Sequence, residues 1–221
     1  MEESIVGFYS FLLFAFVQRF IFYIPFPIDM ALNIAVIYGS VRAARQGIKA
    51  ARFIVKKLEE RKHKVTLVDP LIYKLPLLDK RYREYEPGKA PAAMEKVAEI
   101  LRSSDGYIII SGEYNHGLPP ALKNILDHYY REYFFKPSAI TCYSGGPFAG
   151  LRAAVHLRAV LGELGTVSIP SMFPVSAVQD AFDEEGNAIE KSYESNVKKF
   201  LDEFEWYAYA LKEARKKGLP Y

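Results

Sequence analysis

Five short apolar segments alternate with helical segments between residues 32 and 215, and this alternation restricts the possible folds more than any other feature of the chain. The apolar segments favour β-structure, and the segments between them repeat apolar side chains at helical spacing. The predicted strands are 32–38, 63–68, 107–111, 138–143 and 166–169. The predicted helices are 46–61, 92–104, one that opens at Pro119-Pro120, 148–164 and 189–215. Strands this apolar, separated by amphipathic helices, are typical of a parallel sheet with helices on both faces.

Ligands of such open parallel sheets bind at the carboxyl ends of the strands, close to the point where the strand order reverses. Three loops follow predicted strands in this chain, at 39–47, 111–118 and 144–150. Another connection, 69–91, is rich in proline, tyrosine and charge, which predicts a long ordered loop at the surface. The three strand-end loops are therefore the candidates for one shared ligand site.

The first loop, GSVRAARQG at 39–47, joins a strand to the start of a helix. Helix N-termini offer free N–H groups and a positive dipole end, which favours a bound phosphate. Ser40 can add a hydroxyl, and Arg42 and Arg45 can add charge and forked donors. The loop lacks the GxxxxGK[ST] pattern of nucleoside triphosphate hydrolysis and the GxGxxG pattern of dinucleotide binding. The alternative is a helix-capping serine followed by two solvated arginines.

The second loop, 111–120, has the glycine, asparagine and prolines of a backbone that turns sharply at a strand end. Tyr114 and His116 can flank a planar ring, whereas Glu113 and Asn115 can brace the turn. For Tyr114 the alternative is a tyrosine packed at a dimer surface. For His116 we favour a hydrogen bond to the local backbone over an acid–base role.

The third loop, YSGGPFAG at 143–150, carries two consecutive glycines. Gly145 and Gly146 allow the backbone to approach a ligand closely or to form a positive-φ turn. Arg152 lies one turn into the following helix, where it can contact a ligand or form a salt bridge that supports the loop. Each loop alone has a structural explanation, so the functional prediction rests on all three lying at successive strand ends.

Composition argues against several other functions. The net charge of +3 is small and no dense basic patch accompanies it, which argues against nucleic-acid binding. The single cysteine, Cys142, excludes an intrachain disulfide, an iron–sulfur cluster and a cysteine-built zinc site, and it suits a reducing, cytoplasmic compartment. The four histidines form no closely spaced cluster, so no metal site is expected. The serine-hydrolase pattern G-x-S-x-G is missing around Ser40, Ser111 and Ser144.

Three segments carry a resemblance to a known family: GSVRAARQG at 39–47, EYNHGLPPALKNILDHYYREYFFKP at 113–137 and YSGGPFAGLRA at 143–153. On these segments the sequence resembles the NADPH-dependent FMN reductases, which include quinone, azo and chromate reductases. The resemblance covers nearly everything from Met30 to about Pro170. It implies a flavodoxin-like three-layer α/β sandwich, with a five-stranded parallel sheet in the order 2-1-3-4-5. Many members have a proline where this chain has Gly112.

The resemblance also implies which residues hold FMN. The residues expected at its phosphate are Ser40, Arg42, Arg45 and Gln46. The residues expected along its isoalloxazine ring are Glu113, Tyr114, Asn115, His116 and Gly117. The residues expected to close the pocket are Ser144, Gly145 and Gly146. Members are usually homodimers with the flavin near the interface, and the candidate interface aromatics are Tyr129, Tyr130, Tyr133 and Phe134.

The activity implied by the resemblance is a two-step exchange. NADPH or NADH delivers hydride to N5 of FMN, and a small acceptor then replaces the nicotinamide over the flavin. The acceptor can be a quinone, an azo compound, a metal oxyanion or free flavin, and no side chain is assigned as catalytic. The alternative is a flavodoxin-like electron carrier or flavin-binding module without NAD(P)H turnover. We rank it lower because carrier flavodoxins are typically acidic, whereas this chain is slightly basic.

The N-terminal segment does not follow this pattern. Residues 5–17 and 20–26 are apolar, and together they approach the ~20 residues that span a bilayer. Three interpretations stay open: an anchor on the cytoplasmic side of a membrane through residues 4–28, an apolar arm packed on a partner, or a leader outside the working protein. We favour the leader, because a start at Met30 yields a complete domain. The expected organisation is an extension at 1–30, a flavodoxin-like FMN-binding domain at 31–215 and a tail at 216–221.

Overall fold

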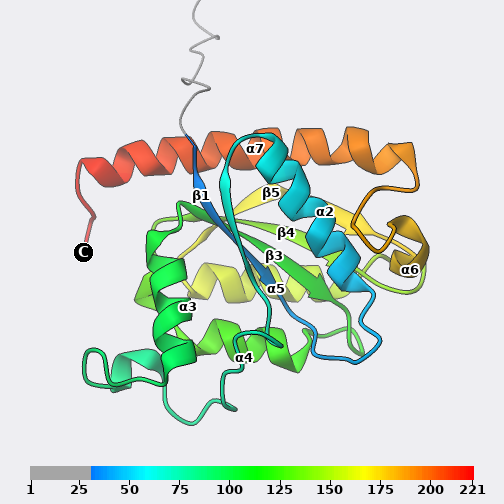
Figure 1. The fold of residues 1–221 in the computed structure, drawn as a ribbon. Helices are drawn as coiled ribbons and strands as arrows, with labels where there is room; N and C mark the ends of the chain where they lie inside the picture. Colours follow the sequence, from blue (N-terminus) through cyan, green and yellow to red (C-terminus); the bar gives the residue numbers. More distant parts are fainter. Residues whose placement is uncertain (1–30) are drawn as a thin grey trace, which may run out of the picture. The chain divides into compact units, whose positions relative to one another are not determined.

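The computed structural model describes residues 31–221 (Figure 1), and these residues contain one five-stranded sheet. Its strands are β1 (Asn33–Tyr38), β2 (Lys64–Val68), β3 (Gly106–Gly112), β4 (Pro137–Tyr143) and β5 (Val167–Val175). Neighbouring strands pair in parallel, in the order β2-β1-β3-β4-β5. This confirms the predicted flavodoxin-like order, in which the direction of strand progression reverses between β1 and β3.

Helices cover both faces of this sheet (Figure 1). The helical elements are α2 (Gly47–Glu60), α3 (Ala92–Ser103), α4 (Pro120–His128), α5 (Leu151–Glu163), α6 (Val178–Ala181) and α7 (Lys191–Lys216), with 3₁₀ turns η1 (Tyr82–Glu84) and η2 (Arg131–Tyr133). The helices α2 and α7 contribute to the core on one face, and α3, α4 and α5 contribute to the core on the other. The predicted three-layer sandwich is therefore confirmed.

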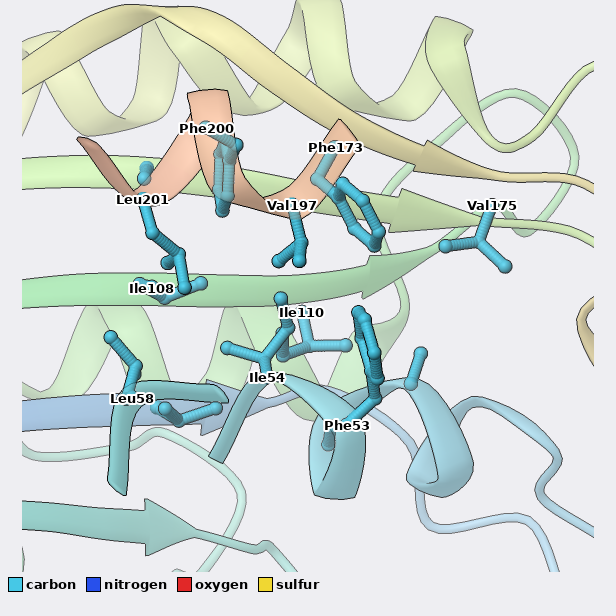
Figure 2. Packing of buried hydrophobic residues seen from close by; sticks show 14 of the residues in the cluster. Phe53, Ile54, Leu58, Ile108, Ile110, Phe173, Val175, Val197, Phe200 and Leu201 are labelled. Atoms are coloured by element: carbon cyan, nitrogen blue, oxygen red, sulfur yellow. The ribbon is translucent and has the colours of Figure 1, made fainter. Parts of the chain in front are cut away.

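Each face of the sheet has its own hydrophobic core. Figure 2 shows the core beneath α2 and α7, where Phe53 of α2 lies beside Ile110 of β3 and Phe200 of α7 packs in the same cluster. On the opposite face, Ile109 of the same strand packs in a cluster with Leu122 of α4. Every residue of β3 and β4 is buried. Burial on both faces explains why these strands read as continuous apolar runs rather than as alternating patterns.

The edge strand β5 is longer than predicted. The sequence pattern ends this strand at residue 169, whereas the structure extends it to Val175. Pro170 and Pro174 lie in the part of the strand that the prediction leaves out, and a proline argues against a central strand. An edge strand tolerates proline, since one of its sides has no neighbouring strand to receive hydrogen bonds. The extension matters for function because it carries the chain to the same sheet edge as the three predicted loops.

Two of the four predicted interface aromatics lie in the core of the chain. Tyr129 is 2% exposed and donates its hydroxyl to the Met94 carbonyl at 3.0 Å. Tyr133 is 0% exposed and packs edge-on against Tyr107, with ring centroids 5.4 Å apart. Their assignment to a subunit interface is therefore wrong, and their spacing reflects burial in the domain itself. Tyr130 and Phe134 are half-buried.

The predictions for the N-terminal segment concern residues outside the described part of the chain. They comprise the extension at 1–30 and its anchor, arm and leader interpretations. Within residues 31–221, no helix combines the length and the apolar character needed to cross a bilayer. The last helix, α7, continues to Lys216, one residue beyond the predicted end of the domain. The domain boundaries themselves remain predictions.

Candidate functional site

The three predicted loops meet around one pocket at the carboxyl ends of β1, β3 and β4. The pocket has a volume of about 150 Å³, and the residues that line it are Ser40, Arg42, Ala44, Arg45, Gln46, Gly112, Glu113, Tyr114, Tyr143, Ser144, Gly145, Val178 and Gln179. Pockets for whole small-molecule ligands measure roughly 300–1,000 Å³. A cavity of this size is too small for a whole ligand of that kind and has room for one end of it.

The first loop presents hydrogen-bond donors at the start of α2. Ser40 is 2% exposed, and its Oγ lies 3.2 Å from the Tyr114 hydroxyl, which ties the first loop to the second. No side chain caps the N-terminus of α2. Free N–H groups at a helix start attract an anion, because they add to the positive end of the helix dipole. The donor set at this end of the pocket therefore suits a phosphate.

The two arginines of the first loop have different surroundings. Arg45 forms a two-pronged ion pair with the buried Asp69, with both N–O distances at 2.6 Å. Its guanidinium carbon also lies 5.2 Å from the centre of the Tyr38 ring. The hydrogen bond to Asp69 is the main cause that raises the pKa of Arg45. Arg42, by contrast, is exposed and forms no ion pair with any residue from 31 to 221. Arg42 therefore carries the uncompensated charge of this loop.

Glu113 of the second loop caps the start of α5. Its carboxylate accepts the backbone N–H groups of Arg152 at 3.1 Å and of Ala153 at 3.3 Å. The Arg152 guanidinium lies 3.4 Å from the same carboxylate. A negative charge at a helix N-terminus is stabilised by the free N–H groups and the dipole. Glu113 and Arg152 thus have the supporting roles that the sequence offered as alternatives to ligand contact.

The remainder of the second loop is a tight turn at the rim of the pocket. Tyr114 and Gly117 exchange two backbone hydrogen bonds, at 3.0 and 2.9 Å. The two residues between them, Asn115 and His116, are exposed and have positive φ angles of 50° and 66°. Within residues 31–221 the His116 side chain has no hydrogen-bond partner, so its expected bond to local backbone is not present. Asn115, His116 and Gly117 do not line the enclosed part of the pocket.

The third loop is held against the end of β5. Ser144 donates its backbone N–H to the Val175 carbonyl at 3.2 Å, and its carbonyl accepts the Val178 N–H at 3.1 Å. Gly145 lines the pocket, and a Cβ added there would come no closer than 3.7 Å to Gln179. Gly146 is exposed and lies outside the lining. The exposed backbone at Gly145 therefore leaves space for a ligand.

Tyr143 is a pocket residue that the sequence reasoning missed. Its ring fills the space left by two glycines, because an added Cβ would approach Tyr143 to 2.0 Å at Gly47 and to 3.0 Å at Gly112. Any side chain at position 112 would place a Cβ at this same point. Burial raises the pKa of Tyr143, and it likewise raises the pKa of Tyr38. Both hydroxyls are therefore protonated at neutral pH.

Val178 and Gln179 were missed for a different reason. They begin α6, directly after the extended end of β5. The predicted strand stopped too early to bring this fourth segment to the sheet edge. Asp69 was missed as well, although its position immediately after β2 was a signal that it lies at the same edge. Within residues 31–221, no group of three or more histidine, cysteine or acidic side chains is arranged to hold a metal ion.

Comparison with known proteins identifies relatives of this chain. Residues 32–180 match the family model described as NADPH-dependent FMN reductase. The quinone reductase of Escherichia coli (strain K12) is 32% identical over 134 residues, which are 59% of this chain and 69% of the relative. A 2-hydroxy-1,4-benzoquinone reductase from Burkholderia sp. is 30% identical over 182 residues, which are 79% of this chain and 95% of the relative.

A solved structure supports the fold. The FerB flavoenzyme NAD(P)H:(acceptor) oxidoreductase from Paracoccus denitrificans is similar to this chain with a TM-score of 0.64. The two sequences are 24% identical, and the similarity covers 80% of this chain and 99% of the other. At this level of identity the likeness concerns the arrangement of strands and helices alone.

Proposed function

We propose that this chain, which belongs to the NADPH-dependent FMN reductase family, reduces quinones with electrons from NADPH or NADH. Membership of the family makes it an FMN-dependent NAD(P)H oxidoreductase. A quinone is the proposed acceptor because relatives named for quinone reduction match 59% and 79% of the chain. The observation that carries the proposal is that three strand-end loops meet around one pocket, whose lining is rich in hydrogen-bond donors that suit a phosphate.

The start of α2 is the proposed site of the FMN phosphate. The Ser40 hydroxyl, the Arg42 guanidinium and the Gln46 side chain border this end of the pocket, next to the uncapped helix N-terminus. Phosphate groups are bound well by N–H groups at helix starts and by forked guanidinium donors. Arg45 has a positioning role in this proposal, because its donors are occupied by Asp69 and the Ser40 carbonyl.

The second and third loops are the proposed site of the flavin ring. Tyr114, Ser144 and Gly145 border the pocket, and the exposed turn at 115–117 continues its rim together with Gly146. Exposed backbone at the glycines suits a flat ring that lies close to the main chain. Glu113 contributes indirectly, since it fixes the third loop through the start of α5.

When bound, FMN supplies the redox chemistry, which takes hydride from the nicotinamide and passes two electrons to the acceptor. The chain holds these groups in contact, since a reacting distance of about 3–3.5 Å removes much of the entropic barrier. The protonated hydroxyls of Tyr38 and Tyr143 place no negative charge beside the pocket.

Anaerobic reduction of the purified protein tests the function. The protein reconstituted with FMN is expected to lose its visible flavin absorbance when NADPH is added, and to regain it when benzoquinone follows. Bleaching without recovery would contradict quinone as the acceptor. Absorbance that persists after both NADPH and NADH would contradict the reductase function, and failure to bind FMN would contradict the site.

A homodimer built around α5 is the proposed assembly, with a second copy of this chain as the partner. Phe148, Leu151 and Val155 are 60%, 40% and 61% exposed, and they follow one another along one side of the start of this helix. Exposed apolar side chains grouped in this way are typical of association surfaces. Phe148 belongs to the third loop, so this surface continues into the rim of the proposed FMN site.

Sedimentation of two variants tests the dimer. Val155→Glu is expected to convert a dimer into a monomer, because it places a charge in an apolar contact. Ile189→Glu is the matched control, since Ile189 is also 61% exposed but lies outside α5. A wild-type monomer, or a Val155→Glu dimer, would contradict this assembly.

A cytoplasmic location is also proposed. The single cysteine, Cys142, is free and buried, and burial raises the pKa of its thiol to about 12. A protein that depends on no disulfide suits a reducing compartment. Fractionation of cells that produce the full chain tests this, and recovery of the domain outside the cytoplasmic side of the membrane would contradict it.

A further inference from the structure

A second and larger cleft lies at the amino ends of the strands, whereas the proposed FMN site lies at their carboxyl ends. It has a volume of about 690 Å³ and borders Lys136, which immediately precedes β4. The FMN site lies at the other end of β4, which has seven residues. At about 3.3 Å per residue, the two sites are on the order of 20 Å apart. A ligand in this cleft is therefore too far away to exchange hydride with the first site.

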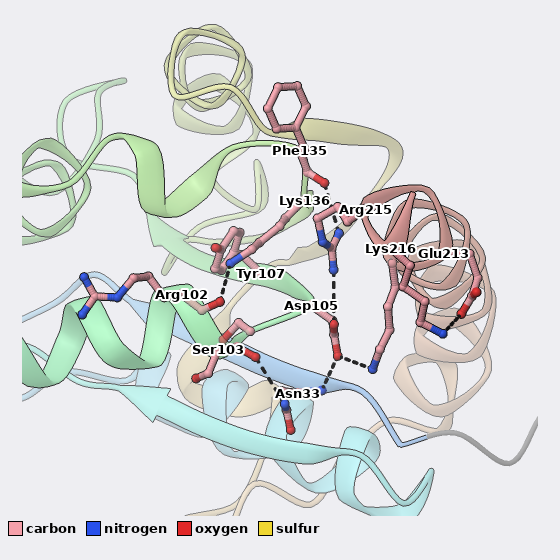
Figure 3. Close-up of polar contacts among 12 residues, drawn as sticks. Asn33, Arg102, Ser103, Asp105, Tyr107, Phe135, Lys136, Glu213, Arg215 and Lys216 are labelled. Carbon is pink, nitrogen blue, oxygen red and sulfur yellow. Dashed lines mark hydrogen bonds and ion pairs between the residues drawn. The ribbon is translucent and has the colours of Figure 1, made fainter. Parts of the chain in front are cut away.

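The lining of this cleft is strongly cationic. Five cationic side chains border it: Arg83, Arg102, Arg131, Lys136 and Arg215. Arg215 is paired with Asp105 (Figure 3). Asp105 also pairs with Lys212. Among residues 31–221, no carboxylate forms an ion pair with any of the other four. Glu132 is the acidic residue of the lining, and its carboxylate accepts the Tyr130 N–H at 3.1 Å.

Lys136 fixes one of these charges in the floor of the cleft. It is 8% exposed, and its ammonium donates to the carbonyls of Leu101 at 2.6 Å, Arg102 at 2.9 Å and Glu132 at 3.2 Å. Figure 3 shows this ammonium beside the end of α3. Cations are favoured at the negative end of a helix dipole, which is where Leu101 and Arg102 lie. Lys136 thus keeps a positive charge under the cleft without filling it.

Aromatic rings form part of the walls. The ring centres of Tyr130 and Phe134 are 5.0 Å apart, and those of Phe135 and Tyr221 are also 5.0 Å apart. The Arg83 guanidinium lies 5.7 Å from the centre of the Tyr130 ring. Aromatic faces and guanidinium planes both stack on flat heterocycles, and guanidinium groups bind phosphate oxygens in pairs.

We propose that this cleft binds a nucleoside phosphate, with its phosphates on the arginines and its base against the aromatic walls. The volume lies within the roughly 300–1,000 Å³ of small-molecule sites. Unpaired cations around an enclosed space repel one another, and an anionic ligand removes that repulsion. This site is separate from the FMN pocket and plays no part in hydride transfer.

Calorimetric titration with ADP tests the proposal. The protein is first saturated with FMN, so that the first pocket is filled. One further equivalent of ADP is expected to bind. Arg131→Gln is expected to weaken this binding about tenfold, because a charge-assisted hydrogen-bond pair is lost. Lys64→Gln is the matched control, since Lys64 is an exposed cation on β2, outside the cleft.

The controls separate this proposal from the proposed function. Arg131→Gln is expected to keep wild-type FMN affinity and NADPH oxidation, because Arg131 lies outside the FMN pocket. A failure of the FMN proposal and a failure of the cleft proposal therefore give different results. Inorganic phosphate and adenosine are titrated alongside ADP. Both are expected to bind at least tenfold more weakly than ADP, because phosphate lacks the base and adenosine lacks the phosphates. Equal binding of phosphate, unchanged binding by Arg131→Gln, or no ADP binding would overturn the proposal.

Discussion

At the scale of single residues, Arg42 and Arg45 differ in what already occupies their donors. The sequence treats them alike, three positions apart in one loop. In the structure, Arg45 is held by Asp69 with two bonds of 2.6 Å, and Arg42 has no such carboxylate among residues 31–221. A ligand phosphate competes with Asp69 for Arg45 but competes only with water for Arg42. Arg45 is therefore tied to folding, and Arg42 is available for binding.

Replacing each arginine by glutamine is expected to separate these two roles. Arg45→Gln leaves the buried Asp69 without its partner, which is expected to lower the free energy of unfolding by about 3 kcal/mol. Arg42→Gln is expected to change it by less than about 0.5 kcal/mol but to weaken FMN binding about tenfold. Urea unfolding and fluorescence titration with FMN measure the two effects. A variant pair with the reverse pattern would contradict the assignment.

Lys136 gives the stability of the protein a distinct dependence on pH. Burial, with Arg215 as the next cause, lowers the pKa of this lysine from 10.5 to about 8. Between about pH 8 and pH 10.5, the unfolded chain therefore binds more protons at this lysine than the folded chain does. The free energy of unfolding rises with pH through this window. Relative to Lys136→Met, the wild-type unfolding free energy is expected to increase by about 1 kcal/mol from pH 7 to pH 9.

The slope of this difference is the quantity to measure, by urea unfolding at several pH values. The size of the difference at any one pH also includes the cost of leaving three carbonyls without their hydrogen-bond donor in the methionine variant. Asp105, Glu132, Arg102 and Arg215 act on Lys136, and all are retained in the variant. A difference that stays constant from pH 7 to pH 9 would show that Lys136 keeps an ordinary pKa.

At the scale of secondary-structure elements, α5 depends on a carboxylate from another loop. Its N-terminal N–H groups at Arg152 and Ala153 bond to Glu113, and Gly150 before them has a φ of 74°. A Cβ at Gly150 would lie 2.5 Å from the Tyr143 carbonyl. The helix start is thus fixed by contacts to β3 and β4 at once, and the third loop is fixed with it.

Glu113→Ala is expected to lower the free energy of unfolding by about 1–2 kcal/mol, because two helix N–H groups lose their acceptor. The variant is also expected to bind FMN more weakly, since the third loop loses its anchor. Arg152→Gln keeps both backbone bonds and is the matched control, with an expected loss below about 1 kcal/mol. Urea unfolding and FMN titration check both variants. Equal losses in the two would assign the effect to the ion pair instead.

The elements themselves were largely predictable from sequence. β1, β3 and β4 are buried on both faces, so their apolar runs and the helical spacing between them identified a parallel sheet. The order of its strands followed from the family resemblance and not from these patterns. The end of β5 was not predictable from the same rule, because Pro170 and Pro174 are tolerated in an edge strand but argue against a central strand. A prediction of the edge position was needed first, and that depends on the whole topology.

The candidate site was predictable as a set of loops but not as a set of contacts. Ser40, Tyr114 and Ser144 do border one pocket, because strand ends of a parallel sheet lie together. The pairing of Arg45 with Asp69 joins residues 24 positions apart, and no local pattern signals it. Likewise, nothing in the spacing of Tyr129 and Tyr133 distinguishes a buried face from an interface.

At the scale of the whole molecule, ligand binding is thermodynamically coupled to folding. A ligand that binds only the folded state stabilises it by an amount that grows with its concentration. FMN at a hundredfold excess over its Kd adds about 2.7 kcal/mol, which raises Tm by roughly 5–10 °C in a domain of this size. Riboflavin at the same concentration is expected to raise Tm less, since it has no phosphate for the start of α2.

Thermal unfolding followed by circular dichroism measures these shifts. Arg42→Gln is the diagnostic variant, because it is expected to reduce the shift with FMN while leaving the shift with riboflavin unchanged. Equal shifts with the two flavins in the wild-type protein would mean that the phosphate is not recognised by this loop.

The prolines of β5 also affect how copies of this protein behave when crowded together. An open sheet has two edge strands, and an exposed edge invites a strand from another chain, which is the first step of aggregation. Pro170 and Pro174 remove two backbone donors from the nine residues of β5. On the other side, β2 begins with the exposed Lys64, whose charge disfavours an incoming strand. Both edges are therefore poor templates for an added strand from another copy.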